Sequence, residues 1–412
     1  MLIELNLENY RSIKEEVSLN MISTKDTSFE NNLIKTEVLK EESLLKSAVI
    51  YGANASGKTN ILLALNFLQM LVMTSHKHQK GNKLPYSPFK LDKQTLSKPT
   101  RIRIVFIKNE TKYLYEISFN SEKIITECLY SYPNNYKKII FERTDTLNYK
   151  FIDDEKKQKL IAERTLPNVL YLSKATQENY EVISKVYDWF KDELNVIGPT
   201  DHPGLVDITA KMLKSGSMKE LILKAMLEAD VGIDDISVDT KKLKIEDLPK
   251  GIPPEIKKLM MNDKEEIEQT KINTIHNGVN FDFEEESDGT MRLFSLIGPW
   301  INALKNGNVL VVDELDTKLH HLLNVFLIKL FHDPTQNKKN AQLIFTTHNT
   351  NLLDIQDIFR RDQIWFTEKN PKGATDLYSL VEYSPRKDKN IERGYLAGKY
   401  GALPFIKENK IF

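Results

Sequence analysis

Apolar residues recur along this chain at spacings that change from one stretch to the next. Near the start, Ile3, Leu5 and Leu7 alternate with polar residues, which predicts a strand with one buried face. The segment 47–51 is short and almost wholly apolar, and it predicts a buried strand. The segment 60–68 keeps its apolar character over a longer stretch and predicts a buried helix. A strand, a short loop and a helix therefore follow one another here.

Four alternating segments follow this helix and are separated by polar turns. They are 101–106, 113–119, 123–127 and 138–141. Short strands at this spacing are typical of an antiparallel meander, because antiparallel neighbours can be joined by tight turns. We therefore expect an antiparallel β subdomain attached to the strand, loop and helix that precede it.

The pattern changes again between residues 177 and 272, where charged segments have helical spacing. Examples are 181–194 and 218–229, with breaks at 198–199 and 251–254. This region lacks the sustained heptads of a long coiled coil, so any arm must be short. We expect a helical insertion.

Two apolar segments in the last third of the chain end in polar residues. The segment 309–312 is followed by Asp313 and Glu314, and the segment 341–346 is followed, after one threonine, by His348. Buried parallel strands have this form, and they deliver polar residues to the sheet edge where phosphate ligands bind.

These elements predict an α/β fold in three parts. An N-terminal lobe with the antiparallel meander covers 1–175, the helical insertion covers 176–272, and a C-terminal lobe covers 273–412. Two further short strands, at 363–366 and 376–380, are expected near the end of the C-terminal lobe.

Charge and cysteine content narrow the class of protein. Lys plus Arg and Asp plus Glu each number 58, a balance that predicts neither a nucleic-acid coat nor a membrane-surface protein. The single cysteine, Cys128, excludes an internal disulfide and fits a reducing compartment. The N-terminus lacks a signal-peptide pattern, and the longest apolar run, 61–73, is too short for a bilayer. We expect a soluble, cytoplasmic protein with no membrane partner.

The loop after the first buried strand carries the clearest chemical motif. Residues 52–59 read GANASGKT, which matches the phosphate-binding pattern GxxxxGK[ST] in full. Backbone N–H groups and the dipole of the following helix favour a phosphate there. We expect Lys58 to reach the β- and γ-phosphate oxygens of ATP and the Thr59 hydroxyl to ligate Mg²⁺. The predicted nucleotide contacts in this loop are Gly52, Asn54, Ala55, Ser56, Gly57, Lys58 and Thr59.

The polar residues after the two later strands complete a predicted hydrolytic site. We expect Asp313 to hold the Mg²⁺ shell, directly or through water, and Glu314 to orient and deprotonate the attacking water. A strand that ends in two acids is common, so the pair alone is weak evidence for a catalytic site. The phosphate loop upstream makes it strong evidence. His348 follows the acids by one helix-sized interval and can hydrogen-bond the γ-phosphate.

The order of these motifs resembles the ABC-type ATPase head of the SMC/RecF class. More narrowly, the chain resembles the abortive-infection and overcome-lysogenisation-defect ATPases of bacteria and archaea. The matching segments run from end to end and leave only the expected helical insertion uncovered. They are Asn9–Ile13, Pro88–Asp92, Glu286–Thr290, Asp313–Asp316 with Leu319 and His320, Thr346–His348, and Gly398–Pro404.

This resemblance implies a dimer in which two heads pack face to face around two ATP molecules. In that class, a signature segment of one head contacts the γ-phosphate held by the other. Here the segment is Glu286–Thr290, and Ser287 and Gly289 would make these contacts. A helix predicted at 291–296 would add the positive end of its dipole. The resemblance also places Arg11 near the nucleotide, whereas Gln94 is only the nearest candidate for the glutamine loop.

The signature segment departs from the LSGGQ pattern of transporters. Asp288 stands where that pattern has its first glycine, and a carboxylate beside a polyphosphate is unfavourable unless it faces away or meets a cation. We therefore expect slow ATP hydrolysis.

Related proteins with fused nucleases carry that domain after the ATPase head, and we expect the segment after His348 to be too short for one. The leading hypothesis is an ATP-dependent sensor or scaffold in anti-phage defence that controls a separately encoded effector such as a nuclease. The alternative is a RecF-like DNA-repair clamp, in which nucleic acid is a partner, and the neutral net charge disfavours it. A transporter ATPase is disfavoured by the signature segment, and a non-hydrolysing nucleotide switch is disfavoured by Glu314.

Overall fold

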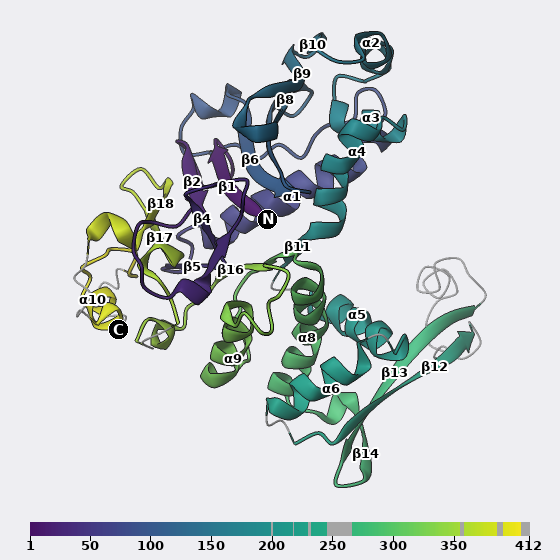
Figure 1. Cartoon of the computed structure of the whole chain (residues 1–412), viewed down its shortest axis with the longest axis vertical. Helices are drawn as coiled ribbons and strands as arrows, with labels where there is room; N and C mark the ends of the chain where they lie inside the picture. The colour runs from purple at the N-terminus through teal and green to yellow at the C-terminus, as the bar shows by residue number, and fades with distance from the viewer. Residues whose placement is uncertain are drawn as a thin grey trace, which may run out of the picture. The chain divides into compact units, whose positions relative to one another are not determined.

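The computed structural model describes residues 1–198, 201–216, 218–229, 232–244, 266–354, 358–384 and 390–404. The chain forms two compact units. The larger unit combines Met1–Pro199, Ala303–Thr317 and Asn324–Phe412, and the smaller unit combines Thr200–Asn302 and Lys318–Leu323. Each unit therefore joins segments that are far apart in the sequence (Figure 1).

The first sheet of the larger unit is antiparallel and has seven strands. Its order is β10 (Asn148–Phe151), β9 (Lys138–Asp145), β8 (Ile124–Tyr132), β7 (Thr111–Phe119), β6 (Thr100–Lys108), β1 (Leu2–Glu8) and β2 (Val17–Asn20). Strands β6 to β9 are the meander that the alternating segments predict, and β1 pairs with β6. The predicted antiparallel subdomain is confirmed. Its strands are longer than the apolar pattern indicated, because polar residues at strand ends still complete the backbone ladder.

The second sheet of the larger unit has six strands and is mostly parallel. Its order is β11 (Leu194–Ile197), β15 (Val309–Val312), β16 (Gln342–Thr346), β5 (Ser47–Gly52), β17 (Ile364–Lys369) and β18 (Thr375–Ser379). Only β18 runs against its neighbour. Strands β5, β15 and β16 are buried over their whole length, as their continuous apolar character predicts. A separate hairpin pairs β3 (Leu33–Lys35) with β4 (Ser43–Leu45).

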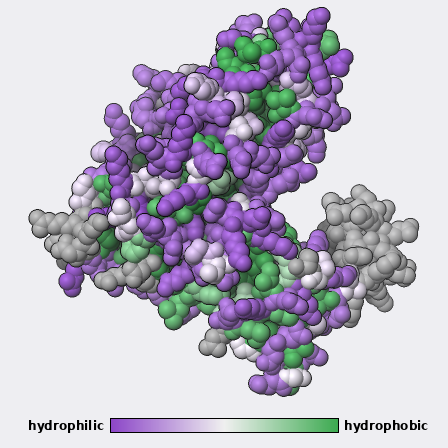
Figure 2. Space-filling view, in the orientation of Figure 1, coloured by the Kyte–Doolittle hydropathy of each residue, from purple (hydrophilic) through white to green (hydrophobic). Residues whose placement is uncertain are grey.

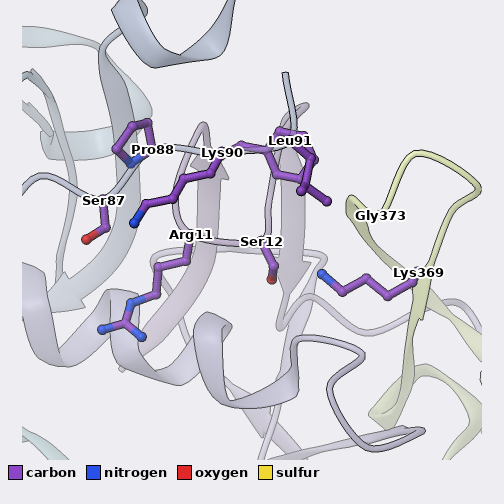
Figure 3. A pocket seen from close by; sticks show the side chains of 9 residues that line it. Arg11, Ser12, Ser87, Pro88, Lys90, Leu91, Lys369 and Gly373 are labelled. Atoms are coloured by element: carbon purple, nitrogen blue, oxygen red, sulfur yellow. The ribbon is translucent and has the colours of Figure 1, made fainter. Parts of the chain in front are cut away.

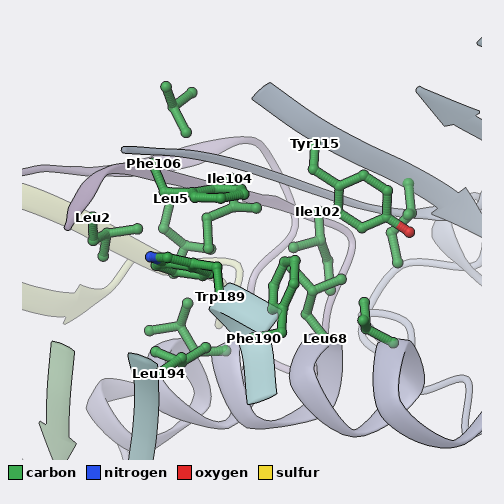
Figure 4. Close-up of a cluster of buried hydrophobic side chains, with 14 of the residues drawn as sticks. Leu2, Leu5, Leu68, Ile102, Ile104, Phe106, Tyr115, Trp189, Phe190 and Leu194 are labelled. Carbon is green, nitrogen blue, oxygen red and sulfur yellow. The ribbon is translucent and has the colours of Figure 1, made fainter. Parts of the chain in front are cut away.

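The helix after the phosphate loop is anchored in the core of the larger unit. This helix is α1 (Lys58–Thr74), and its buried residues join a cluster that includes strands of both sheets. Figure 4 shows Leu68 of α1 in the same cluster as Phe106, Trp189 and Phe190, and the rings of Phe106 and Trp189 stack at 4.2 Å. Tight aromatic packing of this kind fixes the helix, and with it the end of the loop that precedes it.

Five other described α-helices lie wholly or mostly in the larger unit. They are α2 (Glu155–Glu163), α3 (Tyr171–Gln177), α4 (Glu181–Asp188), α9 (His321–His332) and α10 (Ile391–Leu396). Helix α9 lies in the chain between β15 and β16, as the helix-sized interval before His348 predicts.

The smaller unit contains both helices and strands. Its helices are α5 (His202–Lys214), α6 (Lys219–Glu228) and most of α8 (Asp288–Asn306), and its sheet pairs β12 (Asp235–Lys244), β13 (Glu266–His276) and β14 (Val279–Asp282). The α/β class of the chain is confirmed. The structure differs from the predicted helical insertion over 176–272, because β11, β12 and part of β13 fall within that range.

The physical reason for the difference lies in how β12 and β13 are paired. Antiparallel pairing joins Ile236 to Thr274 and Val238 to Ile272, positions that are far apart in the sequence. Their charged, weakly alternating pattern does not distinguish a strand from a surface helix, and the partner strand is what decides. The predicted break at 251–254 lies outside the described residues.

No described helix is long and apolar enough to cross a membrane. Figure 2 shows mostly hydrophilic residues on the visible face of the described chain, with hydrophobic residues in scattered groups. Exposed apolar residues of this scattered kind are normal on protein surfaces.

Candidate nucleotide-binding site

Three neighbouring parallel strands of the second sheet end at one edge. The register pairs Val312 of β15 with Phe345 of β16, and Thr346 of β16 with Ile50 of β5. Because these strands run in the same direction, the residues that follow them meet at the same edge of the sheet. The acids after β15, the histidine after β16 and the phosphate loop after β5 are therefore brought together within the larger unit.

Two glycines of the phosphate loop are required by close contacts. A Cβ atom at Gly52 would lie 2.4 Å from the Thr367 hydroxyl, and one at Gly57 would lie 2.2 Å from the Thr375 hydroxyl. Gly57 also has a φ of +113°, which side chains rarely adopt. The loop therefore leaves room for backbone N–H groups to approach a phosphate, and any side chain at these positions would displace it.

The hairpin β17–β18 holds this loop in place. The Ser56 and Thr367 hydroxyls lie 2.6 Å apart, and the Thr375 hydroxyl donates to the Ser56 carbonyl at 2.7 Å. Sequence reasoning missed both threonines, because nothing in the local pattern around 367 or 375 marks a contact with a loop more than 300 residues earlier.

Lys58 lies inside the loop and meets its carbonyl oxygens. Its ammonium donates to the Gly52 oxygen at 2.8 Å and to the Ala53 oxygen at 3.2 Å. Burial lowers the pKa of Lys58, and the carboxylates of Asp313 and Glu314 oppose that shift. The ammonium is thus a buried cation held by weak acceptors, and phosphate oxygens would be stronger partners for it.

Asp313 has surroundings that suit a cation ligand. Its side chain is buried, and Oδ1 accepts a hydrogen bond from the Thr346 hydroxyl at 2.6 Å. Its Oδ2 is buried and has no hydrogen-bond partner among the residues that the structure describes. A buried carboxylate oxygen without a partner is costly, so the site fits a cation or its bound water at this atom. Thr59, in the first turn of α1, supplies a hydroxyl of the kind that Mg²⁺ accepts.

Glu314 turns the chain sharply at the end of β15. Its φ is +51°, an uncommon value for a residue with a side chain, and its N–H donates to the Thr346 hydroxyl at 2.8 Å. Its carboxylate accepts a long hydrogen bond of 3.3 Å from the Thr317 hydroxyl. Such a loosely held carboxylate can accept a proton from water, which is what a general base requires.

Asp316 fixes the segment that carries His348. Its carboxylate accepts from the Thr347 hydroxyl at 2.7 Å and from the backbone N–H of His348 at 3.2 Å. Partial burial, together with the Lys58 ammonium, lowers the pKa of His348. The imidazole is therefore neutral at neutral pH, and one ring nitrogen can donate to a phosphate oxygen.

A cavity of about 710 Å³ borders the phosphate loop. Residues from the loop, from the end of β16, from β17 and from the C-terminal segment line it, and they include Asn54, His348, Glu368, Tyr395 and Leu403. The matched segment Gly398–Pro404 is thus part of the wall beside the loop. The aromatic ring of Tyr395 also packs 6.0 Å from that of Tyr51, the residue before Gly52.

A second cavity, of about 420 Å³, lies beside the turn that contains Arg11. Figure 3 shows Arg11, Lys90 and Lys369 around it, with Pro88 and Leu91 as apolar lining. Three cations and no acid in this lining suit an anionic ligand that also has an apolar part.

Ser12 connects this second cavity to the phosphate loop and α1. Its hydroxyl accepts from the Asn60 side chain at 2.7 Å and lies 2.8 Å from the Thr375 hydroxyl. Lys369 lines both cavities, and Thr375 links Ser12 of the second cavity to Ser56 of the phosphate loop.

Asn9 explains why the Asn9–Ile13 and Pro88–Asp92 segments occur together. Its buried side chain accepts from the Phe89 N–H at 3.0 Å and donates to the carbonyls of Thr95 and Lys98 at 2.9 and 2.8 Å. This network ties the start of the turn that contains Arg11 to the segment 89–98. Gln94 is exposed and, among the described residues, lies outside the lining of both cavities.

The predicted signature segment, Glu286–Thr290, belongs to the smaller unit. The Ser287 hydroxyl accepts from the Thr290 N–H at 3.1 Å and so caps the start of α8. Asp288 pairs with the Lys318 ammonium at 3.1 Å. The cation that the sequence calls for at Asp288 is therefore present, on a residue that sequence reasoning did not single out. Ser287 and Gly289 do not share a unit with the phosphate loop.

Among solved structures, the chain is similar to the SMC head domain from Thermotoga maritima, with 14% identity, 92% of this chain and 98% of that chain covered, and a TM-score of 0.41. It is also similar to the Smc head domain with an extended coiled coil bound to the C-terminal domain of ScpA derived from Pyrococcus furiosus, at 13% identity. That match covers 97% of this chain and 98% of that chain, with a TM-score of 0.41. A third similar structure is that of the recombination mediator protein RecF-ATPrS in the RecFOR pathway, which is 12% identical. The match covers 92% of this chain and 98% of that chain, with a TM-score of 0.36.

Comparison with curated proteins finds no match. The family model described as "AAA domain, putative AbiEii toxin, Type IV TA system" matches residues 47–354, which is most of the chain. This match includes the phosphate loop, both acids and His348, and it bears out the resemblance to abortive-infection ATPases. The chain belongs to this family of P-loop ATPases.

Proposed function

We propose that the protein binds ATP with Mg²⁺ at the edge of the second sheet and hydrolyses it to ADP and phosphate. The observation that carries this proposal is the buried Oδ2 of Asp313, at the same strand edge as the phosphate loop. No described residue hydrogen-bonds this oxygen. A purely structural carboxylate would have both oxygens satisfied. Bound Mg²⁺ would neutralise charge on the terminal phosphates, and Asp313 and Thr59 would hold it.

The side chains around this edge have distinct roles in the proposed reaction. Lys58 leaves the carbonyls of Gly52 and Ala53 and meets the β- and γ-phosphate oxygens. Glu314 takes a proton from the attacking water, and His348 donates a hydrogen bond to the γ-phosphate. The remaining loop contacts, Asn54, Ala55, Ser56 and Gly57, supply backbone N–H groups and space.

The nucleoside end of ATP would occupy the cavity beside Arg11. Ser12 lines that cavity and hydrogen-bonds Asn60, which directly follows the phosphate loop, so in this proposal the triphosphate extends from the cavity to the loop. Arg11, Lys90 and Lys369 would meet the α-phosphate and the ribose, and the apolar lining would cover a face of the base.

Hydrolysis would require a second copy of the chain. In this proposal Ser287 and Gly289 of one copy contact the γ-phosphate held by the other, and ATP joins the two heads until it is cleaved. A dimer interface that must form and separate in each cycle, with an acid at position 288, supports slow turnover.

At the level of the cell, we propose a cytoplasmic, nucleotide-dependent sensor or scaffold in anti-phage defence that controls a separately encoded effector, such as a nuclease. The family description supports this role, because it names a toxin of a toxin–antitoxin system. The equal numbers of acidic and basic residues continue to disfavour a DNA-repair clamp, which needs a basic face.

The test is a comparison of the purified protein with its Lys58→Ala variant. The wild type should bind ATP and release phosphate slowly, and it should degrade neither DNA nor RNA. Lys58→Ala should lose nucleotide binding and keep its thermal stability, because the loop backbone remains. ATP binding by Lys58→Ala at wild-type affinity would overturn the site, and metal-dependent nuclease activity unaffected by Lys58→Ala would overturn the separate effector. ATP-dependent binding of duplex DNA would favour the clamp.

A further inference from the structure

The signature segment contains two carboxylates, and each has its own cation. Glu286 accepts from His276 Nε2 at 2.6 Å, while His276 Nδ1 lies 2.6 Å from the carbonyl oxygen of Gly232. Both ring nitrogens face acceptors, so the geometry calls for a proton on each, and the imidazole is a cation when both bonds are made. The hydrogen bond from His276 to Glu286 correspondingly raises the pKa of His276. Glu286 is therefore neutralised inside the smaller unit.

Asp288 is neutralised in a different way. Its partner, the Lys318 ammonium, is 3.1 Å away, and the two side chains keep 64% and 52% of their surface exposed. An ion pair this exposed contributes little to stability and exchanges easily. Lys318 can thus leave Asp288 for a stronger anion at small cost.

The backbone also fixes Lys318 beside the signature segment. Lys318 has a φ of +62°, and its carbonyl oxygen lies 3.1 Å from where a Cβ atom at Gly289 would be. A side chain at Gly289 would push the Lys318 backbone away. The ion pair and the close approach of the Lys318 backbone to Gly289 therefore place Lys318 beside the segment.

Building on the proposed function, we propose that Lys318 is a further substrate-contact residue of the composite site. In the free protein its ammonium is paired with Asp288. When a second copy presents its bound ATP to Ser287 and Gly289, Lys318 transfers to the γ-phosphate, which carries more negative charge than a carboxylate and offers three acceptor oxygens. Asp288 is then left beside the phosphate, so it opposes association of the heads.

This exchange predicts effects of opposite sign at the two ends of one ion pair. Asp288→Asn frees Lys318 and removes a negative charge from the phosphate site, so ATP-dependent association should strengthen. Lys318→Ala removes the attractive charge and leaves Asp288 unpaired, so association should weaken. Each change should alter the dimer dissociation constant by about tenfold, the size expected for one charge-assisted contact.

The measurement uses the full chain in a Glu314→Gln background, which should retain ATP. Light scattering with Mg·ATP would give the dimer dissociation constant for Asp288→Asn, Lys318→Ala and the conservative Lys318→Arg. Lys318→Arg should associate like the parent. The matched control is Lys271→Ala, which removes a similarly exposed ion pair to Asp282 in the same unit and should change nothing. ATP binding by the free protein should be the same in all of these variants.

The possible outcomes separate this inference from the proposed function. If the Glu314→Gln parent binds ATP and does not associate, the composite site is wrong and the role of Lys318 falls with it. If the parent associates and Lys318→Ala matches Lys271→Ala, only the role of Lys318 is overturned. If Asp288→Asn and Lys318→Ala weaken association equally, the pair is merely structural and the exchange is overturned.

Discussion

The Thr346 hydroxyl joins both acids at the end of β15 to the neighbouring strand β16. It donates to Asp313 Oδ1 at 2.6 Å and accepts from the backbone N–H of Glu314 at 2.8 Å. One hydroxyl can serve both, because it has one hydrogen and two lone pairs. Thr346 therefore sets the position of the proposed Mg²⁺-binding carboxylate relative to the proposed base.

Replacing this hydroxyl should damage catalysis more than folding. Thr346→Val leaves a buried carboxylate oxygen and a backbone N–H unpaired, so both acids lose their fixed positions. We expect kcat for ATP hydrolysis to fall about 10- to 100-fold, with a higher Mg²⁺ concentration needed for half-maximal rate. Thr346→Ser keeps the hydroxyl and should stay within a few-fold of wild type. Equal rates for the valine and serine variants would show that the bridge has no role.

Two glycine-to-alanine variants can separate the effect of a steric contact in the phosphate loop on ATP affinity from the effect of backbone strain alone. Gly57→Ala places a methyl group 2.2 Å from the Thr375 hydroxyl, so the loop must shift and ATP affinity should fall by at least about tenfold. The control is Gly81→Ala, at a φ of +88° with open space around it. It should cost about 1 kcal/mol of stability and leave ATP binding unchanged. Calorimetric titration with ATP distinguishes the two, and unchanged affinity in Gly57→Ala would contradict the loop geometry.

His332 should make the stability of the larger unit fall in acid. Its ring is buried, Nε2 lies 2.8 Å from the Ser47 hydroxyl, and burial together with Lys46 and Lys329 lowers the pKa of His332 to about 3. The unfolded chain binds a proton near pH 6.5, while the folded chain does not until about pH 3. Lowering the pH through this window therefore favours the unfolded state, by about 1.4 kcal/mol per pH unit.

The check is chemical denaturation of wild type and His332→Gln at pH 7 and pH 5. The wild type should lose about 2 kcal/mol more of its unfolding free energy than the variant over this range. The comparison is made within each protein, between its unfolding free energies at the two pH values, so a different starting stability of the variant does not affect it. Parallel losses in both proteins would mean that His332 does not titrate as its burial requires.

The parts of this molecule that could be predicted from the sequence are those encoded locally. The phosphate loop lies between β5 and α1, and the acids lie after β15, because strand, loop and helix signals each occupy a few adjacent residues. The meander β6–β9 was predictable for the same reason, since its turns are short.

The parts that could not be predicted depend on contacts between distant residues. Thr367 and Thr375 meet the phosphate loop, and Lys318 meets Asp288, with nothing in their own neighbourhoods to mark them. Strands β12 and β13 were missed because each is defined by its partner and not by its own pattern. The hydrogen bonds of the Asn9 side chain are a third case, because nothing in the sequence around this asparagine indicates its distant partners Phe89 and Thr95.

The central claim, that ATP is held and cleaved between two copies of this chain, rests on different roles for Asp313 and Glu314. Glu314→Gln keeps the shape of the side chain and leaves Asp313 to hold Mg²⁺, so ATP should still bind while hydrolysis falls about 10²- to 10⁴-fold. The most direct measurement is the mass of Glu314→Gln in solution by light scattering, with and without Mg·ATP, alone and combined with Ser287→Arg. The account predicts an ATP-bound dimer for the single variant and the nucleotide-free oligomeric state for the double variant. If the chain is already dimeric without ATP, crosslinking between the two heads replaces the mass as the readout. If Glu314→Gln binds ATP but its heads never associate, the account is contradicted. A monomeric nucleotide switch would then be the better description of the protein.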